Sequence, residues 1–495
     1  MNATAVVLYN PPSNRQRKAI LPLSLLALGA LLENRVPYVI VDGNLTPDPL
    51  SALARAIEDL HARVLGVTVM PGLQLVHAVH HCRHLKARYP HLAIVWGGYF
   101  PTQHADVCVR APYVDYVIRG HADLAFPALI DTLSRDTDPG DVPGLVYLDA
   151  VTGRIVVRPM PPIPHPDRLP DFPYHRVAMD RYIRRTCLGT RTLSHHSSYG
   201  CPFFCNFCAV VNMVNGRWYA QSAERTARVV HRLARTWGAN AIEFFDNNFF
   251  VSEDRVAEFA ERITPLGIAW WGEARVDTLS RYADSTWKRL QRSGLRMVFI
   301  GAESGSPKTL HRMNKGGTVT PEQTLELAAR MRRYEIIPEF SFILGNPPDP
   351  EADTAQTIAF IRRLKSVNPE AEIVMYIYTP VPLSGDLYDT ARARGFRFPE
   401  TLEEWLTPEW QAFAQRRSRQ MPWIRKSLHR RVRNFERVLH AYYPTVTDVR
   451  LQGIRRWVLR LLSGWRYRWQ IYTFPLELEI LHRLMHYQRP ETSGF

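Results

Sequence analysis

Cysteine is scarce in this chain of 495 residues. Only six cysteines occur, and three of them lie within a stretch of eight residues. A secreted protein held together by disulfides carries many cysteines spread along the chain, so this distribution excludes such a framework and is typical of a reducing cytosol. The three clustered cysteines therefore need an explanation of their own.

Long hydrophobic runs are also absent. The longest apolar stretch, residues 21–32, is interrupted by Pro22, Ser24 and Gly29. It falls short of the roughly 20 residues that a helix needs to span a bilayer. The first residues lack the basic segment, apolar core and small-residue cleavage site of an export signal. We therefore expect a cytoplasmic protein without a transmembrane helix.

Acidic residues are few towards the end of the chain. The formal net charge is +15, and residues 411–495 hold 17 Lys and Arg against 5 Asp and Glu, so most of the positive charge lies in this tail. A basic tail suits an anionic partner such as a membrane surface, a nucleic acid or an acidic substrate, and it equally suits a solvated face without a partner. Both interpretations stay open.

The first part of the chain alternates short β-branched runs with amphipathic helical stretches. This alternation, between residues 5 and 133, predicts an α/β domain with a doubly wound, Rossmann-like parallel sheet over residues 1–138. A ligand can approach the backbone closely where glycines lie at the carboxyl edge of such a sheet. Glycines fall within or just after the predicted strands at Gly43, Gly66, Gly97, Gly98 and Gly120.

The next two segments differ sharply in composition. Residues 139–190 are rich in proline and contain one hairpin pattern, so we predict a linker there. The strand and helix alternation then resumes over residues 191–398 in six units, which predicts a partial (β/α)6 barrel of the TIM type with active groups at the strand ends.

Residues 399–495 are predicted to form a basic, helical C-terminal domain. Apolar residues recur there at helical spacing with arginines between them, as at Trp457, Leu461 and Leu462. A basic amphipathic helix of this kind fits the headgroup region of a bilayer, which would give peripheral membrane association on the inner face. The alternative is that its aromatic residues pack on the barrel.

The three clustered cysteines occur in the segment Gly-Cys-Pro-Phe-Phe-Cys-Asn-Phe-Cys, as Cys201, Cys205 and Cys208. Three soft thiolates in one loop can hold a metal centre. A structural zinc site normally has four protein ligands, so three cysteines indicate a centre with an open coordination position. A four-iron cluster held by three cysteines has such a position, and the flanking phenylalanines would exclude water from it.

This Cys-x3-Cys-x2-Cys spacing after a predicted strand resembles the signature of the radical S-adenosylmethionine (SAM) superfamily. The resemblance implies that Cys201, Cys205 and Cys208 hold a [4Fe-4S] cluster. In that superfamily the fourth iron binds the amino and carboxylate groups of SAM, and one-electron reduction yields a 5′-deoxyadenosyl radical. The resemblance also implies an electron donor, either a reductase or a flavodoxin or ferredoxin.

Further motifs resemble the cobalamin-dependent branch of that superfamily. They are FFDNNFF (244–250), GEARVD (272–277), GAESGS (301–306), RMNKGG (312–317), FILGNPP (342–348) and TPVPLSGDLYD (379–389). In that branch groups at the strand ends contact SAM, although a carboxylate there can instead cap the next helix. The SAM-binding residues implied are Phe207, Asp246, Arg275, Glu303 and Ser304.

The first domain resembles the cobalamin-binding domain fused to such barrels. The resemblance lies in an NPP near the first strand and in LGVTVM, WGGYFPT and VDYVIRGHAD. The chain departs from the pattern in two places: it lacks the Asp-x-His-x-x-Gly motif whose histidine ligates cobalt, and it has GHAD where an acidic motif is common. The alternative is a nucleotide-type fold that only contacts the barrel. The cobalamin-binding residues implied are Gly66, Thr68, Val69, Met70, Gly97, Gly98, Tyr99 and Gly120.

The function implied is methylation of an unactivated carbon in a small, hydrophobic metabolite. A second candidate is a radical cyclisation of the kind catalysed by the anaerobic porphyrin-ester cyclase, which uses the same cofactors without methyl transfer. RNA modification fits less well, because RNA methylthiotransferases carry three more cysteines in the first domain, where this chain has only Cys82 and Cys108. We therefore expect no specific nucleic acid partner.

Overall fold

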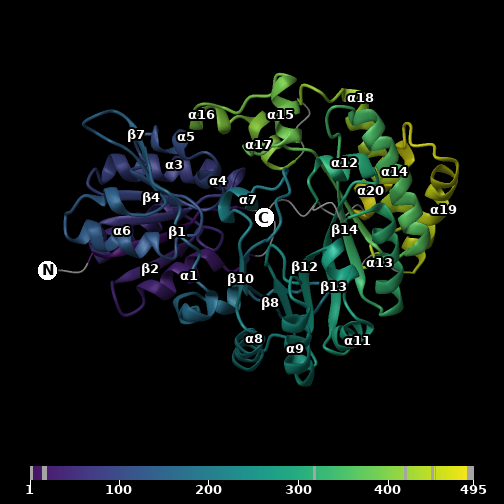
Figure 1. Cartoon of the computed structure of the whole chain (residues 1–495), viewed down its shortest axis with the longest axis horizontal. Coiled ribbons are helices and arrows are strands. Elements are labelled where there is room, and N and C mark those ends of the chain that lie inside the picture. Colours follow the sequence, from purple (N-terminus) through teal and green to yellow (C-terminus); the bar gives the residue numbers. More distant parts are fainter. Residues whose placement is uncertain are drawn as a thin grey trace.

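The computed structural model describes residues 4–13, 19–315, 319–416, 421–447, 451 and 453–487. Two largely parallel sheets lie side by side, the first at the left of Figure 1 and the second at its centre, with the last helices at the right edge. This α/β arrangement confirms the predicted fold class. The last two residues of the RMNKGG motif lie outside the described residues.

The first sheet has the strand order β2-β1-β3-β4-β5-β6-β7. Every residue of β1 is buried, because helices cover both faces of the sheet, as is usual for parallel strands. Its parallel strands are β1 (Val6–Asn10), β2 (Tyr38–Asp42), β3 (Val64–Thr68), β4 (Ala93–Gly97) and β5 (Tyr116–Ile118). Its helices are α1 (Leu23–Leu32), α2 (Pro49–Leu60), α3 (Leu73–Arg88), α4 (Tyr99–Gln103), α5 (Ala105–Val109) and α6 (Ala125–Ser134).

The hairpin predicted within the linker belongs to this first sheet. Its strands are β6 (Leu145–Leu148) and β7 (Ile155–Val157), and β6 pairs antiparallel with β5. The sheet therefore continues beyond residue 138. The chain then passes through single-turn helices to the second sheet, and on the way the Tyr182 hydroxyl donates to the Asp42 carboxylate at 2.8 Å.

The second sheet is parallel throughout, in the order β8-β11-β12-β13-β14-β15, and forms the predicted partial barrel. Its strands are β8 (Thr192–His195), β11 (Ala241–Phe244), β12 (Ala269–Arg275), β13 (Leu295–Glu303), β14 (Ile337–Leu344) and β15 (Glu372–Ile377). Helices on its outer side are α8 (Ala223–Trp237), α9 (Glu253–Ile263), α10 (Val276–Ser280), α11 (Asp284–Arg292), α12 (Pro307–Arg312), α13 (Pro321–Arg333) and α14 (Pro350–Val367).

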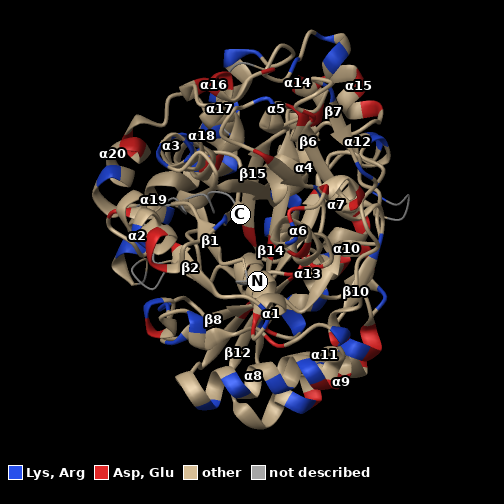
Figure 2. Cartoon of the chain, turned by 90° about the vertical axis from the view of Figure 1, so that its left-hand side faces the viewer, with Lys and Arg blue, Asp and Glu red and all other residues tan. Residues whose placement is uncertain are grey.

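Polar side chains cap the first turns of these outer helices. Charged residues lie on the sides of the helices that face solvent. Ser222 caps α8 by accepting from the Arg225 amide, and Thr320 and Gln323 form a reciprocal capping box at α13. Figure 2 shows that Lys and Arg (blue) and Asp and Glu (red) recur along the ribbons of α8, α9 and α11, which lie at the edge of the molecule. Their apolar sides pack on the sheet, as in Val230 and Phe259.

The C-terminal region contacts both sheets. Helices α16 (Leu402–Trp405) and α17 (Pro408–Ala414) follow α15 (Asp386–Ala393) and pack on α4 of the first domain, where Trp405 lies 4.7 Å from the His104 ring. This aromatic bridge comprises Phe100, His104, Phe398, Trp405, Trp410 and Phe413. The remaining helices, α18 (Lys426–Tyr442), α19 (Ile454–Trp469) and α20 (Leu476–Met485), lie beside α14 (Figure 1).

None of the helices in the described parts of the chain is both long and apolar enough to cross a membrane.

Candidate active site

The three clustered cysteines lie in a loop between two short antiparallel strands, β9 (Ser198–Gly200) and β10 (Trp218–Ala220). The turn into the loop requires glycine at position 200, because its φ is +81° and a Cβ there would lie 2.2 Å from the Arg217 carbonyl oxygen. The loop ends in the short helix α7 (Val210–Val214).

Cys205 is buried, Cys201 and Cys208 are half-buried, and the three thiols are close enough to influence one another. Burial raises the pKa of Cys208 to about 12, and the neighbouring Cys205 and Cys201 raise it further. All three cysteines are free of disulfides. No three His, Cys, Asp or Glu side chains among the described residues converge on a single metal ion. Three mutually close thiols of this kind fit the ligand set of a larger iron–sulfur cluster.

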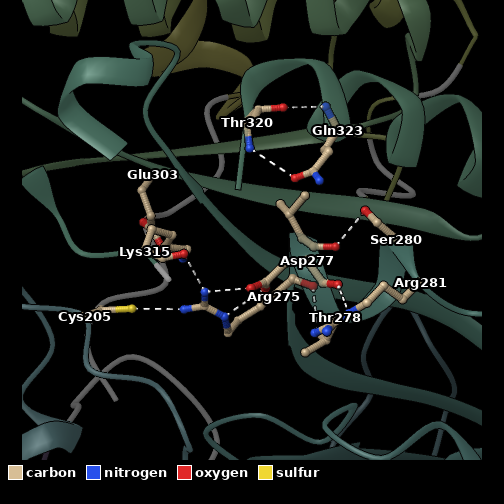
Figure 3. Close-up of polar contacts among 11 residues, drawn as sticks. Cys205, Arg275, Asp277, Thr278, Ser280, Arg281, Glu303, Lys315, Thr320 and Gln323 are labelled. Carbon is tan, nitrogen blue, oxygen red and sulfur yellow. Dashed lines mark hydrogen bonds and ion pairs between the residues drawn. The ribbon is translucent and has the colours of Figure 1, made fainter. Parts of the chain in front are cut away.

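Arg275, at the end of β12, lies directly beside the cysteine loop (Figure 3). Its Nη1 is 2.9 Å from the Cys205 Sγ, and its Nε and Nη2 donate to the two carboxylate oxygens of Asp277 at 2.9 and 3.0 Å. The guanidinium also lies over the Phe203 ring, 3.7 Å from its centroid. A fixed positive charge therefore faces one of the three thiols, and the predicted contact of Arg275 with SAM stays a prediction.

A buried ion pair follows at the end of the next strand. Lys315 Nζ lies 2.6 Å from Glu303 Oε1, and both side chains are less than a tenth exposed (Figure 3). The pair lies over Gly301, where a Cβ would come within 2.2 Å of Glu303 Oε1. Phe207 contacts the same pair, with the Lys315 ammonium 5.6 Å from its ring centroid. The sequence marked Glu303 and Phe207, but it did not single out Lys315.

The other two predicted SAM-binding residues hold turns of the barrel. Asp246 is fully buried and accepts hydrogen bonds from the Ser197 amide and from the hydroxyls of Ser197 and Ser198. Ser304 donates to Asp353 at 3.2 Å. Both side chains therefore have a structural role, which is the alternative to SAM binding for groups at strand ends. Their contact with SAM remains a prediction.

The inner face of the barrel carries acidic residues that the sequence did not single out. Glu273 of β12 is in register with Phe299 of β13, which is in register with Glu339 of β14. Burial, together with the negative charges of Asp246 and Glu339, raises the pKa of Glu273 to about 8. Glu273 is therefore a neutral carboxylic acid at pH 7 and can donate a hydrogen bond.

The predicted cobalamin-binding residues lie mainly at the carboxyl edge of the first sheet. At the end of β4, a Cβ on Gly97 would meet nothing closer than the Ile118 carbonyl oxygen at 4.0 Å, so this position is open. Gly98 has φ +98° and approaches Thr68 Oγ1 and the backbone of Val69. Gly120 also has a positive φ, and its amide donates to Thr102 Oγ1 at 3.0 Å.

Two further residues of this set show different surroundings. Gly66 lies inside β3, where the missing side chain leaves room for Phe126 and Leu8, so its visible role is packing. Met70 is held through its amide, which donates to Gln74 Oε1 at 2.7 Å. Gln74 also donates to Asn10 Oδ1 at 2.7 Å, which explains the asparagine of the NPP motif. The sequence missed Gln74 because a polar residue in a helical pattern gives no signal of its own.

The edge of the first domain meets the cysteine loop. Burial raises the pKa of Tyr99 to about 12, and Cys208 is near enough to raise it as well. Gln103 Nε2 donates to the Ala209 carbonyl at 3.2 Å, and Asn212 Nδ2 donates to Gln103 Oε1 at 2.7 Å. The open glycine edge and the three thiols therefore lie in one region of the molecule.

The comparisons with known proteins agree with this geometry. Residues 18–130 match the B12 binding domain, and residues 196–361 match the radical SAM superfamily. The fold and the site thus define a radical SAM enzyme with a B12 binding domain in front of the barrel. The chain thus combines a B12 binding domain with a radical SAM domain, and its cofactors are a [4Fe-4S] cluster, SAM and cobalamin.

Three relatives illustrate the similarity. An uncharacterised methyltransferase of Pyrococcus horikoshii is 27% identical over 74% of this chain and 79% of the relative. The anaerobic magnesium-protoporphyrin IX monomethyl ester cyclase of a Synechocystis species is 25% identical over 75% of this chain and 74% of the relative. The radical SAM methyltransferase TsrM of Kitasatospora setae, solved with cobalamin and a [4Fe-4S] cluster, has a similar fold (TM-score 0.62, 18% identity, 81% of this chain and 80% of that chain).

The residues present fit the two large cofactors. The loop offers three thiols, which are the donors that iron–sulfur clusters use. The open position at Gly97 and the positive φ of Gly98 leave a side-chain-free edge, where a Cβ would otherwise fill the space that a broad planar ring needs.

Proposed function

We propose that the protein methylates an unactivated carbon of a small molecule. The observation that carries this proposal is the meeting of the two cofactor regions, seen in the hydrogen bond from Gln103 of α4 to the Ala209 carbonyl beside Cys208. A carbon atom placed between the barrel interior and the first-domain edge would be within reach of both. Holding reactants in that order contributes much of the rate enhancement that such an enzyme needs.

The chain's own residues have definable tasks in this reaction. When bound, the cluster supplies the electron that opens SAM, and cobalamin supplies the methyl group. Arg275 holds a positive charge against Cys205, and Phe203 and Phe207 exclude water from the loop. Glu273 offers a neutral hydroxyl to a substrate oxygen or nitrogen inside the barrel. The substrate lies against Phe299 and Glu273 in this proposal, so it combines apolar and hydrogen-bonding groups.

We also infer the finer site assignments that the sequence suggested. Phe207 lies in the loop, and Arg275 and Glu303 lie beside it. These three are the best placed of the five to contact SAM directly or through Lys315. Gly97, Gly98 and Tyr99 would contact cobalamin, and a reductase, flavodoxin or ferredoxin would deliver the electron. Support for methyl transfer comes from the similarity to the methyltransferase of Pyrococcus horikoshii.

The second candidate is oxidative cyclisation without methyl transfer. It is favoured by the 25% identity to the Synechocystis cyclase, over nearly the same length of chain as the methyltransferase match. Both reactions need the same cofactors in the same places, so the product distinguishes them.

Accurate-mass profiling of anaerobically grown cells tests the two candidates. One strain carries the gene, and the other carries the Cys201→Ala, Cys205→Ala, Cys208→Ala variant, with Cys187→Ala as the matched control. Methylation predicts that the variant accumulates a compound smaller than the lost product by one CH2 unit. If the lost product instead differs from the accumulated compound by hydrogen loss or by oxygen in place of two hydrogens, cyclisation replaces methylation as the proposed reaction.

A further inference from the structure

Helix α19 is held to the body of the protein by one face. Leu459, Ser463 and Tyr467 are buried on that face, and Tyr467 stacks on Tyr442 of α18 with ring centroids 4.6 Å apart. Arg362 of α14 donates to the Tyr467 carbonyl oxygen. The face that packs is therefore well defined, and it determines which residues point away from the protein.

The opposite face of α19 is apolar and exposed. Ile454, Trp457, Leu461 and Trp465 follow one another at intervals of three or four residues, and they are 76%, 62%, 60% and 42% exposed. Such spacing places them on one side of the helix. The sequence left open whether these aromatic residues pack on the barrel, and the structure shows that Trp457 and Trp465 do not.

Helix α20 repeats the pattern. Leu476, Ile480 and Leu484 recur every four residues and are at least 60% exposed. The helix is fixed to α19 by a two-pronged ion pair between Arg466 and Glu477, in which Arg466 Nη2 lies 3.0 Å from Glu477 Oε2. In the described residues, eleven of the eighteen exposed large hydrophobic side chains lie between positions 454 and 484. A concentration of this kind marks an interaction surface, because single exposed apolar residues are normally scattered.

The charge beside the apolar face of α19 has a single sign, and the two glutamates of α20, Glu477 and Glu479, are paired with arginines. Helix α19 contains five arginines and no acidic residue, and of these Arg455, Arg460 and Arg468 are exposed. Arg466 is the one that pairs with Glu477. In a two-fold contact between copies of the chain, this face would meet the same arginines of its partner, and like charges would repel. An anionic surface complements it.

We propose that α19 and α20 form a docking surface for an anionic lipid bilayer. The exposed apolar residues enter the headgroup region, where tryptophan is favoured, and the flanking arginines bind lipid phosphates. With a rise of about 1.5 Å per residue, the 16 residues of α19 lie along roughly 24 Å of membrane surface.

This surface is separate from the active site. In Figure 1 the two helices lie at the right edge, on the far side of the barrel from the first domain. Docking would leave the contact between the cysteine loop and the first domain unchanged. The proposal is independent of the reaction, so either can fail without the other.

Cosedimentation of the anaerobically reconstituted holoenzyme with vesicles tests the proposal. Vesicles of phosphatidylcholine alone are compared with vesicles that also contain phosphatidylglycerol. The stripe variant is Trp457→Gln, Leu461→Gln, Trp465→Gln, and its control is Leu148→Gln, Val151→Gln, Val157→Gln on the exposed β6–β7 hairpin. The charge variant is Arg455→Gln, Arg460→Gln, Arg468→Gln, and its control is Arg235→Gln, Lys288→Gln, Arg292→Gln on the outer barrel helices.

We expect the wild type and both controls to bind the anionic vesicles, with weaker binding at high salt. The stripe variant should bind at least about tenfold more weakly, and the charge variant should lose the preference for phosphatidylglycerol. Cluster absorbance and cleavage of SAM should be unchanged in every variant, which shows that all are folded. The proposal is overturned if the wild type does not sediment with anionic vesicles or if both variants bind like their controls. It is also overturned if light scattering shows a dimer that the stripe variant alone dissociates.

Discussion

The two sheet edges that meet at the active site are built in opposite ways. The edge of the first domain consists of glycines and backbone, with Gly97 open and Gly98 in a conformation that side chains rarely adopt. The edge of the barrel consists of paired charges, Arg275 with Asp277 and Glu303 with Lys315. The first edge would therefore accommodate a ligand by shape and the second by charge.

This difference predicts different sensitivities to substitution. Added volume should be most damaging at the glycine edge, whereas lost charge should be most damaging at the barrel edge. The first three variants below separate the two edges, because they are measured by the content of cobalamin or by the properties of the cluster.

The largest effect is expected at the thiols themselves. Changing Cys201, Cys205 and Cys208 to alanine should reduce the iron content and SAM cleavage to background, because no other cysteine lies in this loop. Cobalamin binding should persist if the glycine edge acts by itself. Iron analysis and visible absorbance measure both, with Cys187→Ala as control. Loss of cobalamin together with iron would show that the two edges are not independent.

Arg275 tests the charged edge. Replacing it with glutamine removes the charged donor at 2.9 Å from Cys205 Sγ, so we expect a more negative reduction potential of the cluster and an activity lower by about 10- to 100-fold. Arg275→Lys keeps the positive charge, so its reduction potential should lie between those of the wild type and Arg275→Gln. Redox titration followed by electron paramagnetic resonance measures the shift, and Arg281→Gln on the next helix is the control. An unchanged reduction potential in Arg275→Gln would show that the charge of Arg275 does not act on the cluster.

Gly97 tests the open edge. Gly97→Val adds volume where only the Ile118 carbonyl lies within 4.0 Å, so the fold should tolerate it while cobalamin content falls by about tenfold. Gly97→Ala should give a smaller loss. The cluster should form normally in both variants. Full cobalamin content in Gly97→Val would mean that the ligand does not approach this glycine.

Variants of the buried pair of Lys315 and Glu303 test how much the pairing of the two charges contributes to stability. Lys315→Met leaves a carboxylate buried without its partner and should lower the free energy of unfolding by about 3–5 kcal/mol. Adding Glu303→Gln should recover part of this loss. Denaturant unfolding of the single and double variants measures the coupling. Additive losses would show that the pair does not act as a unit.

The smallest effect, taken per pH unit, concerns Glu273, whose pKa is raised to about 8. Between about pH 5 and 8 the folded protein keeps a proton that the unfolded chain releases, so this group lowers stability by up to about 1.4 kcal/mol per pH unit as the pH rises. Glu273→Gln should remove this slope, and its advantage over the wild type should level off above pH 8. Unfolding at several pH values checks this, with the exposed Glu326→Gln as control. Parallel pH curves for the wild type and Glu273→Gln would contradict the raised pKa.

The fold was accessible from the sequence because it depends on local periodicity. Alternation of apolar strands and amphipathic helices predicted both parallel sheets, and the three cysteines stood out by their spacing alone. The hairpin was also recognised, but its pairing with β5 was not, since pairing depends on which edge strand is free in space.

The site was less accessible, because its main contacts are between distant segments. Lys315 and Glu303 each lie in a recognised motif, yet their pairing follows from the loop that returns after α12. The raised pKa of Glu273 depends on Asp246 and Glu339, which come from two other strands. The outward direction of Trp457 could not be predicted either, because an amphipathic helix can turn its apolar face to the protein or to solvent.

The aromatic bridge between α4 and helices α16 and α17 has a consequence during biosynthesis. Arg83 and Glu403, which form an ion pair beside this bridge, are 320 residues apart in the chain. At roughly 5–20 residues per second, the ribosome needs about 15–60 s to add the segment that covers Phe100 and His104. The newborn first domain therefore spends that interval with its aromatic side uncovered, where a chaperone would find it.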